Sequence, residues 1–262
     1  MNLSPADLSV LAAEGGLALV PLLRYDPIGV EGTERAMELE AATRAELTAR
    51  GILSEAHGGA VAEPIRALLE LLAAPRLLVR VEASFLGAEA EWQFACTTEG
   101  AIEIAELSNR SWQFSAMSPH ELLPRVLELT GLEDRPDITV DSLTLPTRTL
   151  LALPDLIEDE DEGPALGRLV ADGASERSAR ALIDALRAAR SAASVTILYR
   201  PEPQRLVGGE LTWIDGLDAG LWITPTPDTT DWDPDGPDPG PEVELRHVTS
   251  EWIRTELASY LP

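Results

Sequence analysis

The feature that most constrains the fold is a set of four consecutive runs in which apolar and polar residues alternate. Only short turns separate the runs, such as LGAE at 86–89. Alternation places neighbouring side chains on opposite faces of a strand, and turns this short join antiparallel strands. The runs are RLLVRVEASF (76–85), AEWQFACTT (90–98), GAIEIAELS (100–108) and RSWQFSAM (110–117). The sequence therefore predicts an antiparallel meander.

The second half of the chain repeats this order of elements. In each half a helix follows the last strand directly, starting near Ser118 and near Thr249, which are favoured helix-capping residue types. We interpret the repeat as a duplication, although helix–meander–helix is also a common α+β arrangement. The prediction is one α+β domain over residues 1–262, with a central antiparallel sheet flanked by helices and quasi-two-fold halves at about 1–131 and 132–262. Further strands are expected at 193–200, 206–216, 219–225 and 242–248, and helices at 4–16, 33–51, 58–75, 118–131, 145–156, 163–173, 175–191 and 249–261.

The charge of the chain limits its partners. The formal net charge is -25, and all 20 basic residues are arginine. Phosphate backbones and anionic membranes are bound by clustered cations, so we expect neither nucleic acid binding nor membrane insertion. Hydrophobic residues make up 45% of the chain, which is enough for a sizeable core. The composition favours a soluble protein that holds aggregation-prone or basic protein partners.

The expected compartment is the cytoplasm. Cys96 is the single cysteine, so it cannot form an internal disulfide. The N-terminal stretch MNLSPADLSV has neither the cationic start nor the apolar core of a signal peptide. Both features are typical of a protein that works in a reducing compartment.

One segment imitates a calcium site. DWDPDGPDPGPE (231–242) matches the calcium-loop pattern D-x-[DN]-x-[DN]-G-x₅-E at every fixed position. Such loops lie between two helices, whereas the residues that follow here, EVELRHV, alternate as a strand. Four prolines also prevent much of the winding that the loop requires. We therefore interpret 224–242 as an acidic proline-rich loop and expect no metal site, with weak calcium binding as the alternative.

Catalytic patterns are incomplete. HELLP (120–124) resembles the start of the H-E-x-x-H metal motif, but Pro124 stands where the second histidine belongs. The three histidines, His57, His120 and His247, are far apart in the sequence, and neither a nucleophile elbow nor a phosphate-binding glycine loop occurs. The sequence predicts no catalytic or cofactor-binding residue, so we expect a protein that is not an enzyme and needs no cofactor.

Tryptophan suggests a binding surface. The chain has six tryptophans against three tyrosines and three phenylalanines, and tryptophan is among the side chains most enriched in binding hot spots. Four of the six gather around the predicted hairpin 206–224, the loop after it and the closing helix. Core packing remains the alternative for each of them, because alternation does not say which face of a sheet is covered. The predicted partner-binding residues are Trp213, Asp215, Trp222, Trp232 and Trp252.

Three stretches resemble the EspG family. The first is RAELTARGILSEAHGGAVAEPIRALLELLAAPRLLVRV (44–81), in which a Leu-x-x-Arg-Gly-Ile helix end precedes an apolar helix and a strand. The second is a helix that runs into RSAASVTILYR (190–200). The third is GGELTWIDGLDAGLWI (208–223), similar to the strand–Asp–turn–Gly–strand hairpin of the family. The chain differs from the family pattern at Leu221-Trp222, where a basic and then an aromatic residue are expected, and in its acidic proline-rich insert.

The resemblance implies a function. Proteins of this family are cytosolic chaperones of type VII (ESX) secretion, and they bind the apolar tip of a PPE subunit in a PE–PPE heterodimer. The resemblance implies a quasi-two-fold antiparallel sheet flanked by helices, and a PE–PPE-type or other helical secretion substrate as the partner. The alternatives from the residues alone are an acidic interaction or regulatory protein without a dedicated client, and a hydrolase without a recognisable motif.

Overall fold

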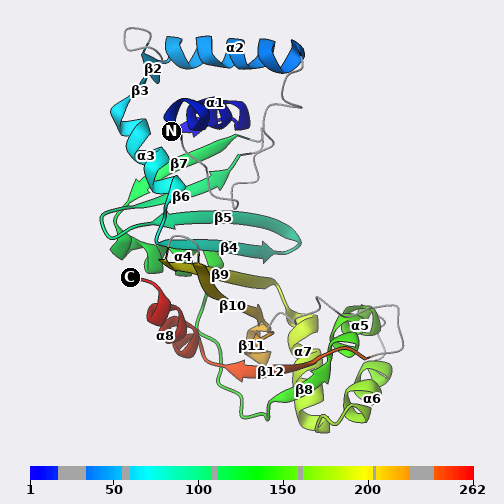
Figure 1. Ribbon diagram of the computed structural model, residues 1–262. Coiled ribbons are helices and arrows are strands. Elements are labelled where there is room, and N and C mark those ends of the chain that lie inside the picture. Colours follow the sequence, from blue (N-terminus) through cyan, green and yellow to red (C-terminus); the bar gives the residue numbers. More distant parts are fainter. Residues whose placement is uncertain (17–33, 55–59, 108–110, 159–161, 203–204, 225–238) are drawn as a thin grey trace. The chain divides into compact units, whose positions relative to one another are not determined.

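The structure, a computed structural model, describes residues 1–262 except 17–33, 55–59, 108–110, 159–161, 203–204 and 225–238. Its main sheet has the strand order β1-β7-β6-β5-β4-β9-β10-β11-β12-β8 among the described residues (Figure 1). The pairs β1–β7, β5–β6, β6–β7, β10–β11, β11–β12 and β12–β8 are antiparallel. The predicted α+β class, an antiparallel sheet with helices, is confirmed.

The elements follow the predicted order, except that the helix predicted over 58–75 begins at Glu63 and is preceded by the short strand at Ala60–Val61. The strands are β1 (Asn2–Leu3), β2 (Leu53–Ser54), β3 (Ala60–Val61), β4 (Leu77–Phe85), β5 (Ala88–Cys96), β6 (Ala101–Glu106), β7 (Trp112–Met117), β8 (Leu143–Pro146), β9 (Ser191–Glu202), β10 (Arg205–Asp215), β11 (Leu221–Ile223) and β12 (Glu242–Val248). The α-helices are α1 (Pro5–Gly15), α2 (Glu34–Ala49), α3 (Glu63–Ala73), α4 (Leu122–Thr130), α5 (Thr147–Glu158), α6 (Gly163–Ala171), α7 (Glu176–Ala188) and α8 (Ser250–Tyr260).

Capping chemistry sets several helix starts. Ser4 and Asp7 form a reciprocal capping box at α1, as the residue spacing requires. Thr249 accepts a hydrogen bond from the Trp252 backbone N–H at the start of α8. The helix expected at 145–156 begins instead at Thr147, because the four residues before it pair with β12 as strand β8.

The chain divides into two compact units. Unit 1 consists of Met1–Arg80, Glu91–Leu122 and Ile197–Gly208, and unit 2 of Val81–Ala90, Leu123–Thr196 and Gly209–Pro262. Four long strands, β4, β5, β9 and β10, contribute residues to both units.

In unit 1, helices α1, α2 and α3 cover one face of the sheet. Their buried leucines, among them Leu11, Leu47 and Leu69, form one apolar cluster with residues of the meander. The cluster takes alternate strand residues, such as Ile102 and Ile104 of β6, as the period of two demands. The remaining members from the sheet are Leu3, Leu78, Ala95, Trp112 and Phe114.

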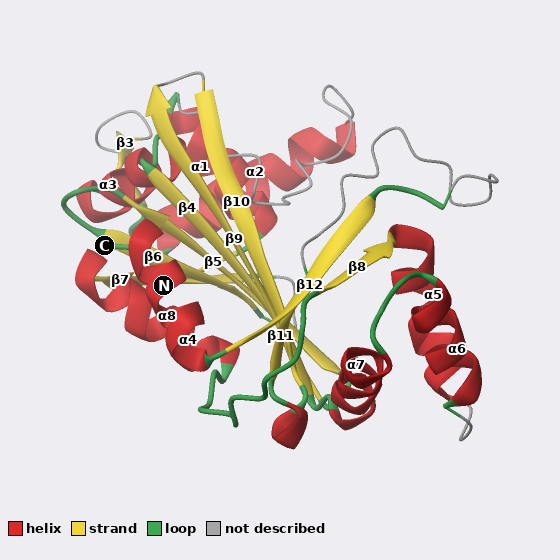
Figure 2. Cartoon of the chain, turned by 90° about the horizontal axis from the view of Figure 1, so that it is seen from below, coloured by secondary structure: helices red, strands yellow, loops and turns green. Residues whose placement is uncertain are grey.

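In unit 2, helices lie on both faces of the sheet (Figure 2). Leu245 of β12 packs in an apolar cluster with residues of α5, α6 and α7. Its neighbour Arg246 lies over the ring of Trp252 on α8. Since consecutive strand residues point to opposite faces, α8 and the α5–α7 group lie on opposite sides of β12.

The two halves of the chain have the same order of elements. Each has a short strand, three helices, four strands and a helix, disregarding β2 and β3 among the described residues. Counted from the middle of the sheet outward, the strands run 4-5-6-7-1 in one half and 9-10-11-12-8 in the other. The two compact units do not coincide with the predicted halves 1–131 and 132–262, so these halves and the duplication stay predictions.

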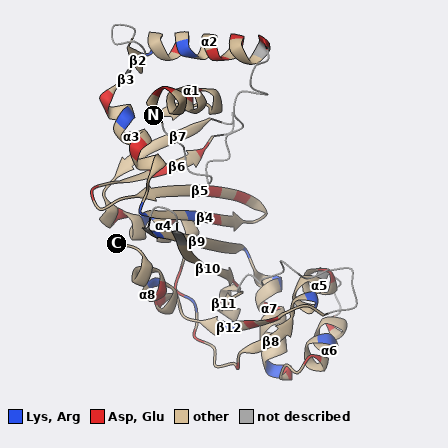
Figure 3. Ribbon diagram, in the orientation of Figure 1, with Lys and Arg blue, Asp and Glu red and all other residues tan. Residues whose placement is uncertain are grey.

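Within the described residues, no helix has both the length and the apolar character needed to span a bilayer. Acidic side chains are spread over the elements of each unit (Figure 3).

Candidate partner-binding site

The hairpin β10–β11 carries three of the five residues predicted to bind a partner. Trp213 pairs with Ile223, and Asp215 with Leu221. Trp222 pairs with Ile214, so its side chain points to the face opposite Trp213. Trp213 is 2% exposed and Trp222 is fully buried, with its indole N–H donating to the Ala219 carbonyl at 3.1 Å. Both rings therefore pack in the core of unit 2.

Asp215 is buried in an ion pair. Its two carboxylate oxygens accept from Nε and Nη2 of Arg135 at 2.7 and 2.6 Å, and Oδ1 also accepts from the Leu217 backbone N–H at 2.9 Å. Only 7% of the Asp215 side chain is exposed. The hydrogen bonds from Arg135 to Asp215 raise the pKa of the guanidinium. The bidentate geometry fixes the turn to a residue 80 positions away in sequence.

Two glycines let the turn pack closely. A Cβ on Gly216 would lie 2.6 Å from the Cβ of Ala185 on α7. Gly220 has a φ of 78°, and a Cβ there would lie 2.2 Å from Nε2 of His247. The turn is thus enclosed by α7 and β12, and its side chains have little room to rearrange.

The segment between α4 and β8 contacts the β10–β11 turn, α8 and β12. Besides the Arg135 pair, Asp134 accepts hydrogen bonds from Ser250 at 2.6 Å and from Arg254 at 2.8 Å, both on α8. The hydrogen bond from Ser250, followed by that from Arg254, lowers the pKa of Asp134. Asp137 lies 3.7 Å from Nδ1 of His247. We call residues 132–142 the linker segment.

His247 of β12 packs against Gly220 of the β10–β11 turn. Its side chain is 5% exposed, and its ring meets that of Trp222 edge to face at a centroid distance of 6.0 Å. Burial lowers the pKa of His247, while Asp137 and a backbone hydrogen bond to Pro136 act in the opposite direction. The imidazole is therefore neutral at neutral pH, a structural side chain in the core.

The other two predicted residues differ in what the structure says of them. Trp252 is half-buried on α8, with the guanidinium carbon of Arg246 5.3 Å from its ring centroid. Trp232 and most of the segment 231–242 lie outside the described residues, although Glu242 opens β12. Among the predicted contact residues that the structure describes, Trp252 is the one whose side chain is partly exposed. Contact of any of the five with a partner stays a prediction.

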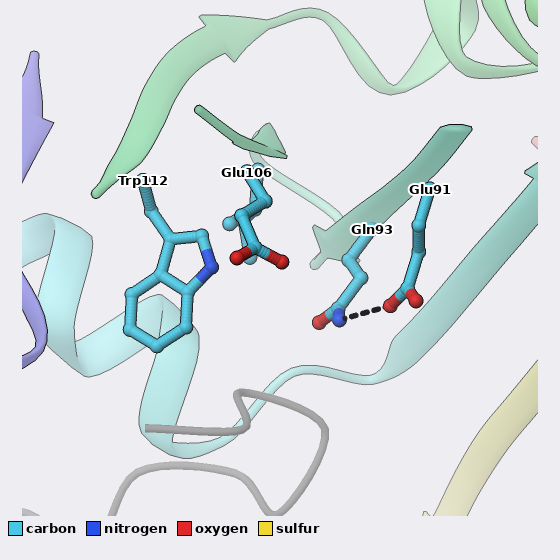
Figure 4. Close-up of a pocket in the computed structure, with 5 residues that line it drawn as sticks. Glu91, Gln93, Glu106 and Trp112 are labelled. Carbon is cyan, nitrogen blue, oxygen red and sulfur yellow. Dashed lines mark hydrogen bonds between the residues drawn. The ribbon is translucent and has the colours of Figure 1, made fainter. Parts of the chain in front are cut away.

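One site escaped the sequence reasoning. Trp112 of β7 lines a small pocket in unit 1 together with Glu91, Gln93, Ile104 and Glu106 (Figure 4). These residues form no sequence motif. The strand register, which sets Glu106 opposite Trp112, brings their side chains together. Within the described part of the chain, no group of three or more His, Cys, Asp or Glu side chains is arranged to hold a metal ion.

These features define an α+β protein built on a long antiparallel sheet, with a buried hairpin turn that holds the linker segment. A model of the EspG family matches residues 4–232, and the chain belongs to that family.

A solved structure has the same fold. It is that of the Mycobacterium tuberculosis type VII secretion system chaperone EspG5 in complex with a PE25-PPE41 dimer, with a TM-score of 0.61. The match covers 100% of this chain and 96% of that one at 15% sequence identity, so the likeness is one of fold. No curated protein matches the sequence.

Proposed function

We propose that the chain is a cytoplasmic chaperone of type VII (ESX) secretion that binds the apolar tip of a PPE-type partner and keeps it soluble for export. The observation that carries this proposal is the likeness, over the whole chain, to EspG5 in a complex with a PE25-PPE41 dimer. Membership of the EspG family supports it. The charge of -25 supports it too, since like charge keeps copies of a chaperone apart while an apolar surface stays available.

The proposed partner surface is the exposed side of α8, where Trp252 is the described anchor. Trp232 lies outside the described residues and stays a predicted contact. Trp213, Asp215 and Trp222 support this surface indirectly. Their buried side chains hold the hairpin in place, and Asp215 also holds the linker segment through Arg135. A half-buried tryptophan supplies apolar contact area at a small cost in side-chain entropy.

We propose that this function involves no catalysis and no cofactor. His247 is buried and held neutral, which suits packing better than proton transfer to a substrate. Asp215 already uses both carboxylate oxygens on Arg135. Neither group is thus available as a general acid or base in this geometry.

Co-expression tests the proposal. The chain is produced with each PE–PPE pair encoded in the same genome, and complexes are sought by size-exclusion chromatography. A stable complex with one pair, and recovery of a PPE subunit that precipitates alone, is the expected result. If every pair precipitates as it does without the chain, the chaperone proposal is wrong, and an acidic protein without a dedicated client becomes the better description.

Two matched variants test the proposed surface. Trp252→Glu puts a charge on α8 and should abolish capture of the client. Met37→Glu places the same charge on an exposed apolar residue of α2, which is 58% exposed, and should leave capture intact. Undiminished capture by the Trp252 variant would remove α8 from the partner surface without touching the chaperone proposal.

A further inference from the structure

Arg246 of β12 lies beside the partly exposed ring of Trp252. Its guanidinium carbon is 5.3 Å from the centroid of that ring, a distance typical of a cation–π contact. Because Leu245 packs with α5, α6 and α7, the next residue of the strand points to the side of α8. Arg246 is exposed and Trp252 is half-buried. The exposed side of α8 therefore has a guanidinium and an indole ring next to each other, and both belong to unit 2.

Two other arginines near α8 are neutralised within the protein. Arg135 is paired with Asp215, and Arg254 with Asp134. No ion pair or side-chain hydrogen bond found among the described residues includes Arg246. Its contact with the ring holds the guanidinium in place and leaves the charge uncompensated. Arg246 thus has hydrogen-bond donors that an external carboxylate can use.

One acidic residue shares this face of β12. Glu244 precedes Arg246 by two residues, so the two side chains leave the strand on the same side, roughly 7 Å apart. Both are exposed, and together they have no net charge. At physiological ionic strength, charges beyond about 8 Å are largely screened. These two side chains, rather than the net charge of -25, therefore determine which charged groups fit here.

We propose that Arg246 selects a partner that places an acidic side chain beside the apolar residue in contact with Trp252. The inference deepens the proposed function and rests on it, in that the partner is the secreted client. A carboxylate accepts two parallel hydrogen bonds from a guanidinium, which fixes the direction of the contact as well as its distance. A client with an apolar residue alone at this place would cover the guanidinium and leave its charge without a counter-charge, which disfavours that client. Trp252 then supplies apolar contact, and Arg246 supplies specificity.

A titration of the full-length protein tests this chemistry without a client. The probe is 3-phenylpropionate, whose ring can contact Trp252 while its carboxylate binds Arg246. The neutral control of the same shape is 3-phenylpropionamide. The readout is the indole N–H resonance of Trp252, which is assigned by its loss in Trp252→Phe. We expect a saturable shift with a Kd of roughly 10 mM for the anion, and binding of the amide that is weaker by about threefold or more.

Two variants make the titration decisive. Arg246→Gln removes the charge and keeps a planar end group beside the ring, so it should abolish the difference between the two probes. Arg66→Gln removes the same charge from α3, where the side chain is 60% exposed, and should leave the difference unchanged. The inference is overturned by the absence of a saturable shift with the anion, by equal affinity for the two probes, or by an Arg246→Gln variant that still distinguishes them. An Arg246–Trp252 contact with a structural role alone would give equal affinities.

Charge-exchanged variants extend the test to the client. Glu244→Arg combined with Arg246→Glu keeps the net charge of -25 and reverses the order of the two charges, so it should weaken capture of a PE–PPE pair by about tenfold. Glu63→Arg combined with Arg66→Glu makes the same exchange on α3 and should leave capture intact.

Client capture also separates this inference from the proposed function. If the wild-type chain captures a pair and the variant exchanged at 244 and 246 captures it equally well, the inference is wrong and the chaperone function stands. If the wild-type chain captures no pair, the chaperone function fails, and the titration alone decides whether Arg246 binds a carboxylate.

Discussion

Removing the carboxylate of Asp215 should destabilise the protein strongly. Asp215→Ala deprives Arg135 of two charge-assisted hydrogen bonds and leaves the Leu217 N–H without its acceptor. Hydrogen bonds to charged groups each contribute ~1.5–3 kcal/mol. Arg135 keeps an ion pair with Glu133 at 2.9 Å, which offsets part of the loss. We therefore expect the free energy of unfolding to fall by about 3 kcal/mol.

Urea denaturation followed by tryptophan fluorescence measures this change. For a chain of this size, the loss corresponds to a fall in Tm of about 6–12 °C. Glu133→Ala is the matched control, because Glu133 contacts the same guanidinium but is 69% exposed, and it should cost less than about 0.5 kcal/mol.

A double-mutant cycle with Arg135→Met shows whether the two side chains act together. We expect the effects of Asp215→Ala and Arg135→Met to fall short of their sum by about 2 kcal/mol. Additive effects, or a loss below about 0.5 kcal/mol for Asp215→Ala, would refute the argument that this pair holds the linker segment on the turn.

Three further predictions concern the same part of unit 2. Because burial lowers the pKa of His247, the unfolded chain takes up that proton first as the pH falls below about 6.5. The corresponding stability is fully present above that pH and is lost between it and the pKa of the folded state. His247→Gln should flatten this part of the profile of urea midpoints against pH, and an unchanged slope would contradict the assignment. Gly220→Ala should cost about 1–3 kcal/mol because of its φ of 78° and the approach to His247. Gly100→Ala, with no atom within 4 Å of the new Cβ, should be near neutral in the same unfolding assay, and equal losses would exclude the steric reason. Trp222→Ala should cost about 3–5 kcal/mol because the ring is fully buried. Trp252→Ala should have a smaller effect on the unfolding free energy and a larger one on client capture, and the reverse ranking would assign the binding role to the wrong tryptophan.

Much of the fold could be predicted because its signals are local. Alternation along 76–117 predicts β4 to β7, and the capping residue Thr249 predicts where α8 begins. Strands β1 and β8 escaped prediction because segments of two and four residues are too short to show a period. Pairing with β7 and β12 makes them strands, and that pairing is a long-range property.

The candidate site was less accessible to sequence reasoning. Asp215 can be identified as a turn residue, but its partner Arg135 is 80 positions away and belongs to no motif. Trp213 and Trp222 could each have faced solvent, since alternation gives two faces and does not tell which one a helix covers. The pocket at Trp112 depends on the register of β5, β6 and β7, which the sequence leaves open.

The contacts of the linker segment show what the residues of the hairpin motif do in this protein. Three neighbouring side chains, on residues 134, 135 and 137, each reach a different element: α8, the β10–β11 turn and β12. Asp215 and Gly220 therefore act on the packing of the buried turn. A signature made of such enclosed residues reports the fold, and partner choice has to be compared at exposed positions.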